Sequence, residues 1–306
     1  MANESERKSG KKWVIVGVIA VVLAALAGGI FWYTQVKLPH QKALAAYESA
    51  DAVYDEAATA LSTNNDALST KIKELEALAN SEEPPLDAKL LESSGAVIGQ
   101  AQAVLVKVPP MPASLDEAKG SSTDEINAFT SELEEITATI EAVEPYDDQI
   151  KQLDEALKSL SDSIAQMAQV TNPSEKFVIE RLTGLPNITG VQAATEDHDP
   201  NQQLNKQGGY TAAVFFSSDL VNKSKLYNKG DIVTVGTEGG GSVEVYTSVE
   251  DAEKREAYLG AFDGTVLSSG SHHVVGTCVV RVSTHLTGSQ QKALQTSIVE
   301  SLTRLD

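Results

Sequence analysis

Residues 13–33 read WVIVGVIAVVLAALAGGIFWY, and this uncharged run of 21 residues constrains the chain more than any other feature. At a rise of about 1.5 Å per residue, a helix of this length spans roughly 31 Å, close to the thickness of a bilayer's hydrocarbon core. Trp13 opens the run and aromatic residues 31–33 close it, where amphipathic rings prefer the membrane interface. The run therefore predicts a transmembrane helix.

Charge asymmetry predicts the orientation of this helix. Basic residues crowd its amino side at positions 7, 8, 11 and 12, whereas Lys37 is the only charge close behind it. The positive-inside rule places residues 1–12 as a cytoplasmic tail and the chain from residue 34 onward outside the plasma membrane. No other uncharged stretch reaches 18 residues, so we expect a single-pass protein. Transporters and channels are thereby excluded.

A cleaved signal peptide is the alternative interpretation of this run. Ala25-Leu26-Ala27 fits the small-x-small pattern that precedes a cleavage site. The apolar run continues for six residues past Ala27, which favours an uncleaved signal-anchor. Ala20, Ala24 and Gly28 also form a row of small residues, so a homodimer through the membrane helix or through the helices that follow is a further hypothesis.

Composition excludes several classes of partner and site. The chain has 43 Asp and Glu against 24 Lys and Arg, a formal charge of −19, so we expect no nucleic-acid partner. Cys278 is the only cysteine, which rules out an intramolecular disulfide framework and a Cys-rich zinc site. No motif indicates a cofactor.

Residues 38–172 have the heptad spacing of packed helices. Two polar residues, Asp51 and Asn65, interrupt the apolar seam of the first helix, and we expect water near Asp51 or Ala50 rotated into its place. This first seam comprises Leu44, Tyr47, Asp51, Tyr54, Ala58, Leu61, Asn65, Leu68, Ile72, Leu75 and Ala79.

Proline residues divide the rest of this helical region. Pro84-Pro85 ends the first helix, an Ala-rich helix follows over residues 86–106, and residues 107–120 are expected to form a loop. A capping box at Ser122-x-x-Glu125 opens the third helix, in which Pro145 predicts a kink or short break. Its seam comprises Ile126, Phe129, Leu133, Ile136, Ile140, Val143, Ile150, Leu153, Leu157, Leu160, Ile164 and Met167.

These segments have two ways to bury their seams. They fold back on one another as an antiparallel bundle within one chain, or they pair between chains as a parallel coiled coil. The Pro-Pro corner and the second segment favour the bundle. In either case residues 38–172 form a helical stalk.

Residues 173–306 predict an α+β head domain. We expect a first helix capped by Asn172, with Pro173 at its first position. The expected strands are residues 188–195, 210–217, 242–246 and 273–283, and the expected helices are residues 249–262, capped by Thr247, and the segment after Thr287. The strand–helix–strand order predicts parallel neighbours in a mixed sheet, with helices on one face.

Residues 177–306 resemble a known type of domain. The strings TEDHDPNQQLNKQGGYTAAVFFSS, GGGSVEVYTSVEDAEKREAYLGAFDG and SGSHHVVGTCVVRVSTHLTGSQQ are similar to the C-terminal domain of single-span surface proteins of bifidobacteria and related Gram-positive bacteria, loosely labelled Ebh-like. The resemblance implies a thick-walled bacterium without an outer membrane and a domain held in or near the wall. It implies no catalytic residues.

Two loops of the head have the composition of ligand sites. Asp197, Asp199 and Asn201 have the oxygen spacing that begins a calcium loop, but the closing glutamate and the flanking helices are missing. A plain hairpin loop is the favoured interpretation, and a weak cation site is the alternative. Residues 239–241, three glycines, precede a strand rather than a helix, which indicates a flexible turn rather than a phosphate cradle.

Nucleophilic catalysis finds little support in the sequence. On one continuous strand, His273 would face away from Cys278 and His272 would lie about 20 Å from it. We therefore expect Cys278 to be a buried small hydrophobe. The sequence predicts a membrane-anchored protein whose stalk presents an interaction domain to a wall polymer, an envelope protein or a host surface. The alternative is a wall-associated enzyme, for which His198, His272 or His285 would have to line a polar pocket.

Overall fold

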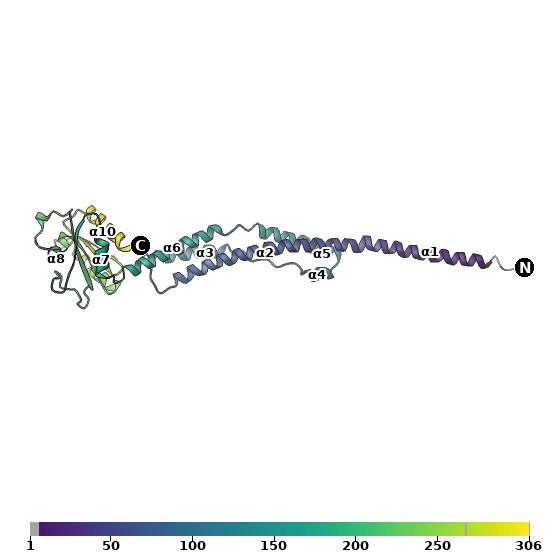
Figure 1. The fold of residues 1–306 in the computed structure, drawn as a ribbon, viewed down its shortest axis with the longest axis horizontal. Coiled ribbons are helices and arrows are strands. Elements are labelled where there is room, and N and C mark those ends of the chain that lie inside the picture. Colours follow the sequence, from purple (N-terminus) through teal and green to yellow (C-terminus); the bar gives the residue numbers. More distant parts are fainter. Residues whose placement is uncertain (1–5, 267, 306) are drawn as a thin grey trace. The chain divides into compact units, whose positions relative to one another are not determined.

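The computed structural model describes residues 6–266 and 268–305, with side chains from Val18 onward. Residues 1–5 of the expected tail, and the side chains of residues 6–17 that include Trp13, lie outside this description. The chain divides into two compact units (Figure 1). The first comprises residues up to Lys71 together with Ala101–Ile150, and the second comprises Ile72–Gln100 together with Lys151 onward.

Helical backbone runs without interruption from the apolar run into the expected stalk. Helix α1 (Glu6–Trp32) continues through a π-turn, η1 (Tyr33–Lys37), into α2 (Leu38–Ala79). Pro39 explains the π-turn, because it has no N–H for the carbonyl of Gln35 and its ring clashes with that carbonyl in an α-helix. The Leu38 N–H instead donates to the carbonyl of Tyr33.

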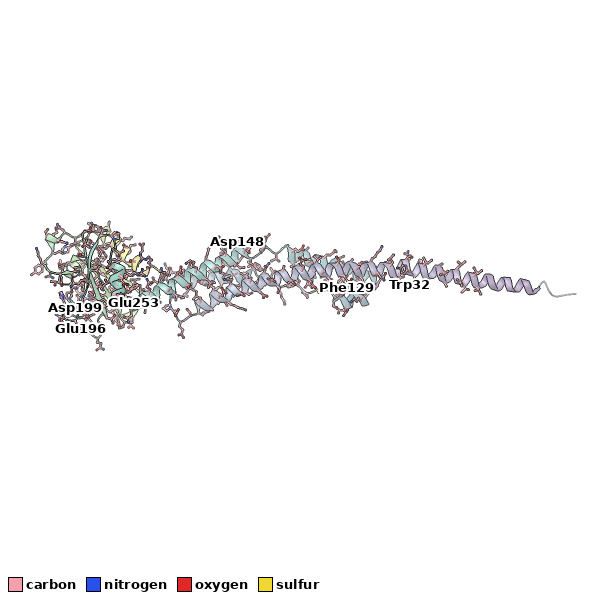
Figure 2. The ribbon with its side chains drawn as sticks, in the orientation of Figure 1. Trp32, Phe129, Asp148, Glu196, Asp199 and Glu253 are labelled. Atoms are coloured by element: carbon pink, nitrogen blue, oxygen red, sulfur yellow. The ribbon has the colours of Figure 1, made fainter. Side chains whose placement is uncertain are left out.

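The apolar part of this helix has no partner among the described residues. One stretch near the N-terminus is long and apolar enough to cross a membrane, and none of that stretch is buried. The Trp32 side chain, 55% exposed, projects from this part of the helix (Figure 2). Water is a poor solvent for so large a contiguous apolar surface. A cleaved signal sequence has the same length and composition, and the experiment below separates the two.

Helix α2 packs against later segments of the same chain. These are α4 (Leu115–Gly120) and α5 (Thr123–Glu141). Their shared core contains Ala43, Tyr47, Ala50, Tyr54, Leu61, Ala118, Ile126, Leu133 and Ile140. The prediction of a plain loop over residues 107–120 was wrong at its end, because Ser114 and Glu117 form a capping box that starts α4. The capping box predicted at Ser122 is confirmed.

Polar residues of the first seam have specific partners. Ala50 is buried and Asp51 stays partly exposed. This agrees with the expectation that Ala50 takes the place of Asp51 in the seam. The Asn65 side-chain amide donates to the carbonyl of Val106 at 2.9 Å and accepts from the Tyr146 hydroxyl at 3.0 Å. The Tyr54 hydroxyl donates to the carbonyl of Pro109 at 2.7 Å. These side chains therefore tie α2 to the extended segment that follows the second helix.

Two more helices belong to the stalk region. These are α3 (Lys89–Ala103) and α6 (Asp147–Gln169), and the chain is non-helical between α5 and α6, which confirms the break expected at Pro145. The Leu86 N–H donates to the carbonyl of Ser163 at 3.0 Å, which holds the Pro-Pro corner against α6. Leu153, Leu160 and Ile164 of the predicted seam are buried on α6.

A five-stranded antiparallel sheet forms the centre of the head. Its strands are β1 (Ile188–Ala193), β2 (Ala212–Ser218), β3 (Gly240–Val245), β4 (Ser271–Val275) and β5 (Cys278–Val282). They lie in the order β1-β2-β3-β5-β4, with every neighbouring pair antiparallel. The prediction of a mixed sheet was therefore wrong.

The error arose in the last predicted strand, which is in fact a hairpin. Gly276 and Thr277 turn the chain, so that Val275 pairs with Cys278. Gly276 has φ +57°, and a Cβ there would meet the carbonyl oxygen of Val170 at 2.5 Å, so glycine is required. Strand β5, the second half of the expected strand 273–283, is consequently an antiparallel neighbour of β3. Strand β4, its first half, runs parallel to β3 but is separated from it by β5.

Helices cover both faces of the sheet, not one as predicted. On one face, α7 (Glu175–Leu182) and α10 (Gly288–Thr303) pack against Val214, Phe216 and the alternate residues of the other strands (Figure 1). On the other face, α8 (Ile232–Val235) and α9 (Val249–Gly260) pack against Ala213, Phe215 and Val279.

Helix caps in the head agree with the sequence in one case out of three. Thr287 and Gln290 form the predicted capping box of α10. The cap of α7 is Ser174 rather than Asn172, which adopts a left-handed conformation with φ +46°. The cap of α9 is Ser248 rather than Thr247, and its side chain accepts from the N–H of Asp251. Hydroxyl or amide side chains one or two positions apart compete for the cap, and the path of the entering chain decides between them.

Candidate functional site

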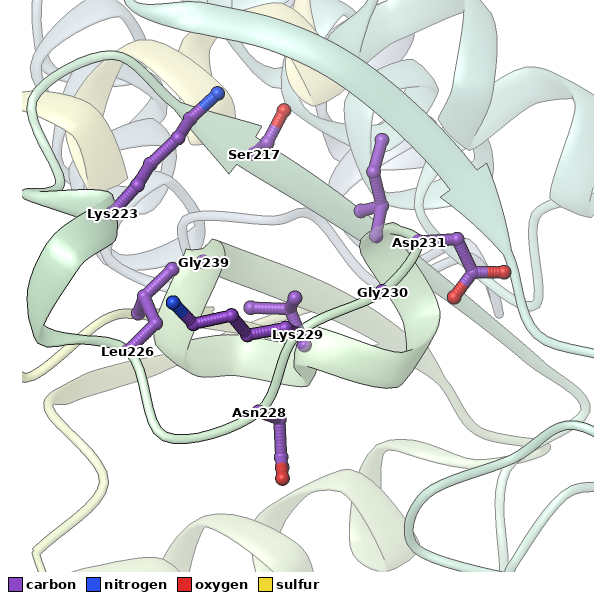
Figure 3. Close-up of a pocket in the computed structure, with 10 residues that line it drawn as sticks. Ser217, Lys223, Leu226, Asn228, Lys229, Gly230, Asp231 and Gly239 are labelled. Atoms are coloured by element: carbon purple, nitrogen blue, oxygen red, sulfur yellow. The ribbon is translucent and has the colours of Figure 1, made fainter.

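A pocket of about 350 Å³ opens beside the end of β2 (Figure 3). A 3-10 turn, η2 (Lys223–Lys225), and the loop that follows it form one wall, and α8 with the 3-10 turn η3 (Gly236–Gly239) forms the other. Its lining combines three apolar side chains, Leu226, Ile232 and Val235, with Ser217, Asn228, Lys223, Lys229 and Asp231. A pocket of this size that joins apolar walls to a few polar groups is typical of a ligand site.

Short local motifs build both walls of this pocket. The Asn222 side chain accepts from the Ser224 N–H at 3.1 Å and caps η2. The Asp231 carboxylate accepts from the Thr234 N–H at 2.8 Å and caps α8. Ile232 joins the pocket to the sheet, because its N–H donates to the side chain of Gln192 at 3.1 Å. The loop is therefore anchored at both ends.

The charges in the pocket are unbalanced. Lys223 and Lys229 form no ion pair within the described part of the chain. Asp231 is the only carboxylate in the lining, and its oxygens accept from Thr234 and, at 3.0 Å, from Gln192. Those hydrogen bonds lower the pKa of Asp231 to about 2. Its carboxylate is turned away from both ammonium groups (Figure 3).

A second hollow, the polar groove, lies between α9 and the loop that joins β1 to β2. It measures about 580 Å³ and is lined by Asn201, Gln203, Gly208, Gly209, Tyr246, Asp251, Lys254, Arg255 and Tyr258. Its cations are paired: Lys254 lies 3.0 Å from Glu250 and 3.4 Å from Asp251, and Arg255 binds Glu244. The groove therefore offers no free positive charge to a ligand.

A buried ionic network lies beneath the polar groove. The fully buried Glu244 carboxylate accepts from Arg255 Nε at 2.8 Å, Arg281 Nη1 at 2.6 Å and the Tyr246 hydroxyl at 3.0 Å. Burial raises the pKa of Glu244, but the two guanidinium groups outweigh burial and hold that pKa below its usual value. Burial and the adjacent carboxylate raise the pKa of Tyr246. Arg255 of α9 and Arg281 of β5 both bind Glu244 of β3, so the network fixes α9 on the sheet, although Arg281 Nε is buried without a hydrogen-bond partner among the described residues.

The Asp197–Asn201 loop has the hydrogen bonds of a plain loop. Asp199 is 8% exposed, and each of its carboxylate oxygens accepts two hydrogen bonds. The four donors are the N–H groups of Asn201, Gln203 and Leu204 and the hydroxyl of Tyr210. Together they fill the acceptor positions of the carboxylate. Asp197 is exposed, and the described residues contain no group of three or more His, Cys, Asp or Glu side chains able to hold a metal ion.

The three glycines at 239–241 allow close packing rather than forming the flexible turn that we expected. Gly239 ends η3, whereas Gly240 and Gly241 lie in β3. A Cβ on Gly241 would meet the carbonyl oxygen of Arg281 at 2.2 Å and the ring of Phe216 at 2.4 Å. Glycine is needed there because backbone and ring approach the strand too closely for a side chain.

The three histidines considered for an active site, His198, His272 and His285, each lie beside a carboxylate, and none lines either hollow. His272 is 3.3 Å from Glu256 and from Asp263, and His285 is 3.9 Å from Glu238. His198 Nε2 lies 3.0 Å from the Thr234 hydroxyl and 3.6 Å from Asp231. In His198 the same ring nitrogen faces both the hydroxyl and the carboxylate. In a catalytic triad, one ring nitrogen contacts the nucleophilic hydroxyl and the other contacts the carboxylate. These contacts favour structural roles.

Cys278 is buried, as predicted, although the face argument that led there was wrong. Because the strand is a hairpin, His273 lies opposite Val280 on the face of Cys278, and His272 lies opposite Arg281 on the other face. Burial raises the pKa of the Cys278 thiol to about 12, which suppresses the nucleophilic thiolate.

No protein-family model matches the chain, and no curated protein and no solved structure matches it either. The candidate site therefore stands on its geometry alone. Sequence reasoning missed the pocket beside β2, although the segment KSKLYNK at 223–229, three lysines in an acidic chain, was a signal for it. A second sequence signal for this pocket was the capping residue Asp231, which stands directly before the apolar Ile232.

Proposed function

We propose that this chain is a single-span membrane protein whose helices 38–172 hold an α+β interaction domain outside the membrane. The observation that supports the proposal is the apolar helix near the N-terminus, no part of which is buried against the described chain. Such a surface is stable in lipid and costly in water. The helical region buries a seam of its own and needs no membrane.

The orientation and the setting rest on charge and on resemblance. The basic residues before the run favour a cytoplasmic N-terminus and an uncleaved signal-anchor. The similarity of residues 177–306 to Gram-positive surface proteins favours a wall polymer or an envelope protein as partner. Within the head, the pocket beside β2 is the favoured contact point, because its lysines, unlike the cations of the polar groove, have no ion pair among the described residues.

Cysteine accessibility tests this topology, because the native thiol is buried and gives no background. Tyr227→Cys places a thiol at a position that is 91% exposed in the head, and Asn3→Cys places one in the tail. In intact cells a membrane-impermeant maleimide should label Y227C alone, and permeabilised cells should label both. The unsubstituted chain is the matched control.

The reverse labelling pattern would refute the orientation. Recovery of a mature protein whose first residue is Gly28 would show instead that the run is a cleaved signal peptide. Labelling of neither variant before permeabilisation would place the head inside the cell and would contradict the proposal altogether.

A further inference from the structure

Positive charge is concentrated at one place in the head. Residues 173–306 contain 16 acidic and 11 basic residues, and three of the basic ones lie between positions 223 and 229. Two of these three, Lys223 and Lys229, line the pocket beside β2, whereas Lys225 does not. The pocket is thus positive in a domain that is negative as a whole, which favours an anion there by local attraction.

Pairing of charges separates this pocket from the polar groove. In the groove, each lining cation already has a carboxylate within 3.4 Å, so an anionic ligand would have to compete with Glu244, Glu250 or Asp251. In the pocket, no described carboxylate pairs with Lys223 or Lys229, and Asp231 is held by Thr234 and Gln192. An anion entering the pocket therefore displaces water rather than a protein group.

The rest of the lining specifies more than charge. The Lys223 ammonium group and the Ser217 hydroxyl lie on one side of the pocket, and Lys229 extends toward Leu226 on another (Figure 3). The Ser217 hydroxyl lies 2.9 Å from the Thr189 hydroxyl, and when it accepts that hydrogen bond its own proton is available to an anion. The pocket also has an apolar wall, formed by Leu226, Ile232 and Val235. An inorganic ion would not bury this apolar surface, whereas a ligand with an apolar body would.

The geometry points to a binding site for an anionic ligand that carries an apolar body, with its phosphate or carboxylate group between Lys223 and Lys229 and its body against Leu226 and Val235. This assignment rests on the proposed function only for its setting outside the membrane. Binding by the purified chain does not depend on topology, so the two proposals fail separately.

Calorimetric titration of the full chain in lipid nanodiscs tests the assignment. The probes are phenyl phosphate, benzoate, inorganic phosphate and the neutral benzyl alcohol, in about 0.1 M salt to screen diffuse surface charge. Phenyl phosphate or benzoate should bind saturably at one site and more tightly than inorganic phosphate, and benzyl alcohol should not bind. The ratio between phenyl phosphate and benzoate identifies the preferred anionic group.

Variants then locate the site. Lys223→Gln and Lys229→Gln should each weaken phenyl phosphate about tenfold, the effect of losing one hydrogen bond to a charged group. Lys225→Gln, on the same turn but outside the pocket, is the matched control and should change binding less than about twofold. Leu226→Ala should weaken phenyl phosphate but leave inorganic phosphate unchanged.

Three results would overturn the assignment. Absence of saturable binding of either aromatic anion would show that the pocket takes no such ligand. Equal binding of benzyl alcohol would show that charge is not recognised. An equal loss in K225Q would show diffuse attraction to the loop rather than a site, and thermal unfolding of each variant verifies that it is folded.

Discussion

Removing the Glu244 carboxylate should destabilise the head more than any other single charge deletion. In Glu244→Ala, Arg255 loses two hydrogen bonds and Arg281 loses one, and both guanidinium groups stay where only 17% and 7% of their side chains are exposed. Removing one partner of a buried ion pair typically costs about 3–5 kcal/mol, because the remaining charge is left without compensation. Glu253→Ala, an exposed glutamate on α9, is the matched control.

Hydrogen exchange of the full chain in detergent measures this effect locally. Amides of β3 and β5 should exchange roughly 150-fold to several thousandfold faster in E244A than in the unsubstituted chain, since about 1.4 kcal/mol corresponds to tenfold. E253A should leave them unchanged. Equal exchange in the two variants would refute the reasoning that the network holds α9 on the sheet.

The same network predicts a pH dependence. The pKa of Glu244 is lower in the folded chain than in the unfolded chain, so its stabilisation is complete above the unfolded-state value of about 4.3. That stabilisation is lost as the pH falls through the folded-state pKa. Glu244→Gln lacks this titration, and its stability should therefore change less between neutral and acidic pH than that of the unsubstituted chain.

Two further predictions concern packing. Leu133→Ala should lower the free energy of unfolding of the first unit by about 2–5 kcal/mol because Leu133 is fully buried, and Val53→Ala, in the same unit but at 47% exposure, should have a much smaller effect in the same urea titration. Cys278 should resist iodoacetamide at pH 8 in the folded chain, since burial raises its pKa to about 12, and should react fully in denaturant. Rapid labelling of the folded chain in mass spectrometry would contradict the buried placement.

Local signals predicted the starts and ends of helices well. The capping boxes at Ser122 and Thr287 and the break at Pro145 each depend on a few neighbouring residues, and the structure has all three. Wrong caps occurred where two capable residues lie within two positions of each other, as at Thr247 and Ser248 and at Asn172 and Ser174. In those cases the direction in which the chain enters the helix decides, and that direction is set by tertiary packing.

Sheet order could not be predicted because it depends on one turn inside an apolar run. The sequence SHHVVGTCVVRV alternates well enough for one long strand, and a single glycine is the only mark of the hairpin. Val170, more than a hundred positions earlier, fills the space against which Gly276 turns. A contact so distant in sequence leaves no local pattern. The errors in strand pairing and in the faces assigned to His272 and His273 all result from this one unpredicted turn.

The pocket beside β2 depends on a similar non-local arrangement of Asp231. A carboxylate two positions after Lys229 would be expected to neutralise it, because the two are close along the chain. The structure instead commits that carboxylate to the Thr234 N–H and to Gln192 on the neighbouring strand, which also lowers its pKa to about 2. The same hydrogen bonds of Asp231 that cap α8 therefore also keep its carboxylate from pairing with Lys223 or Lys229. A substitution at Gln192 should weaken the hold on Asp231 and reduce the attraction of the pocket for anions, although Gln192 does not line it.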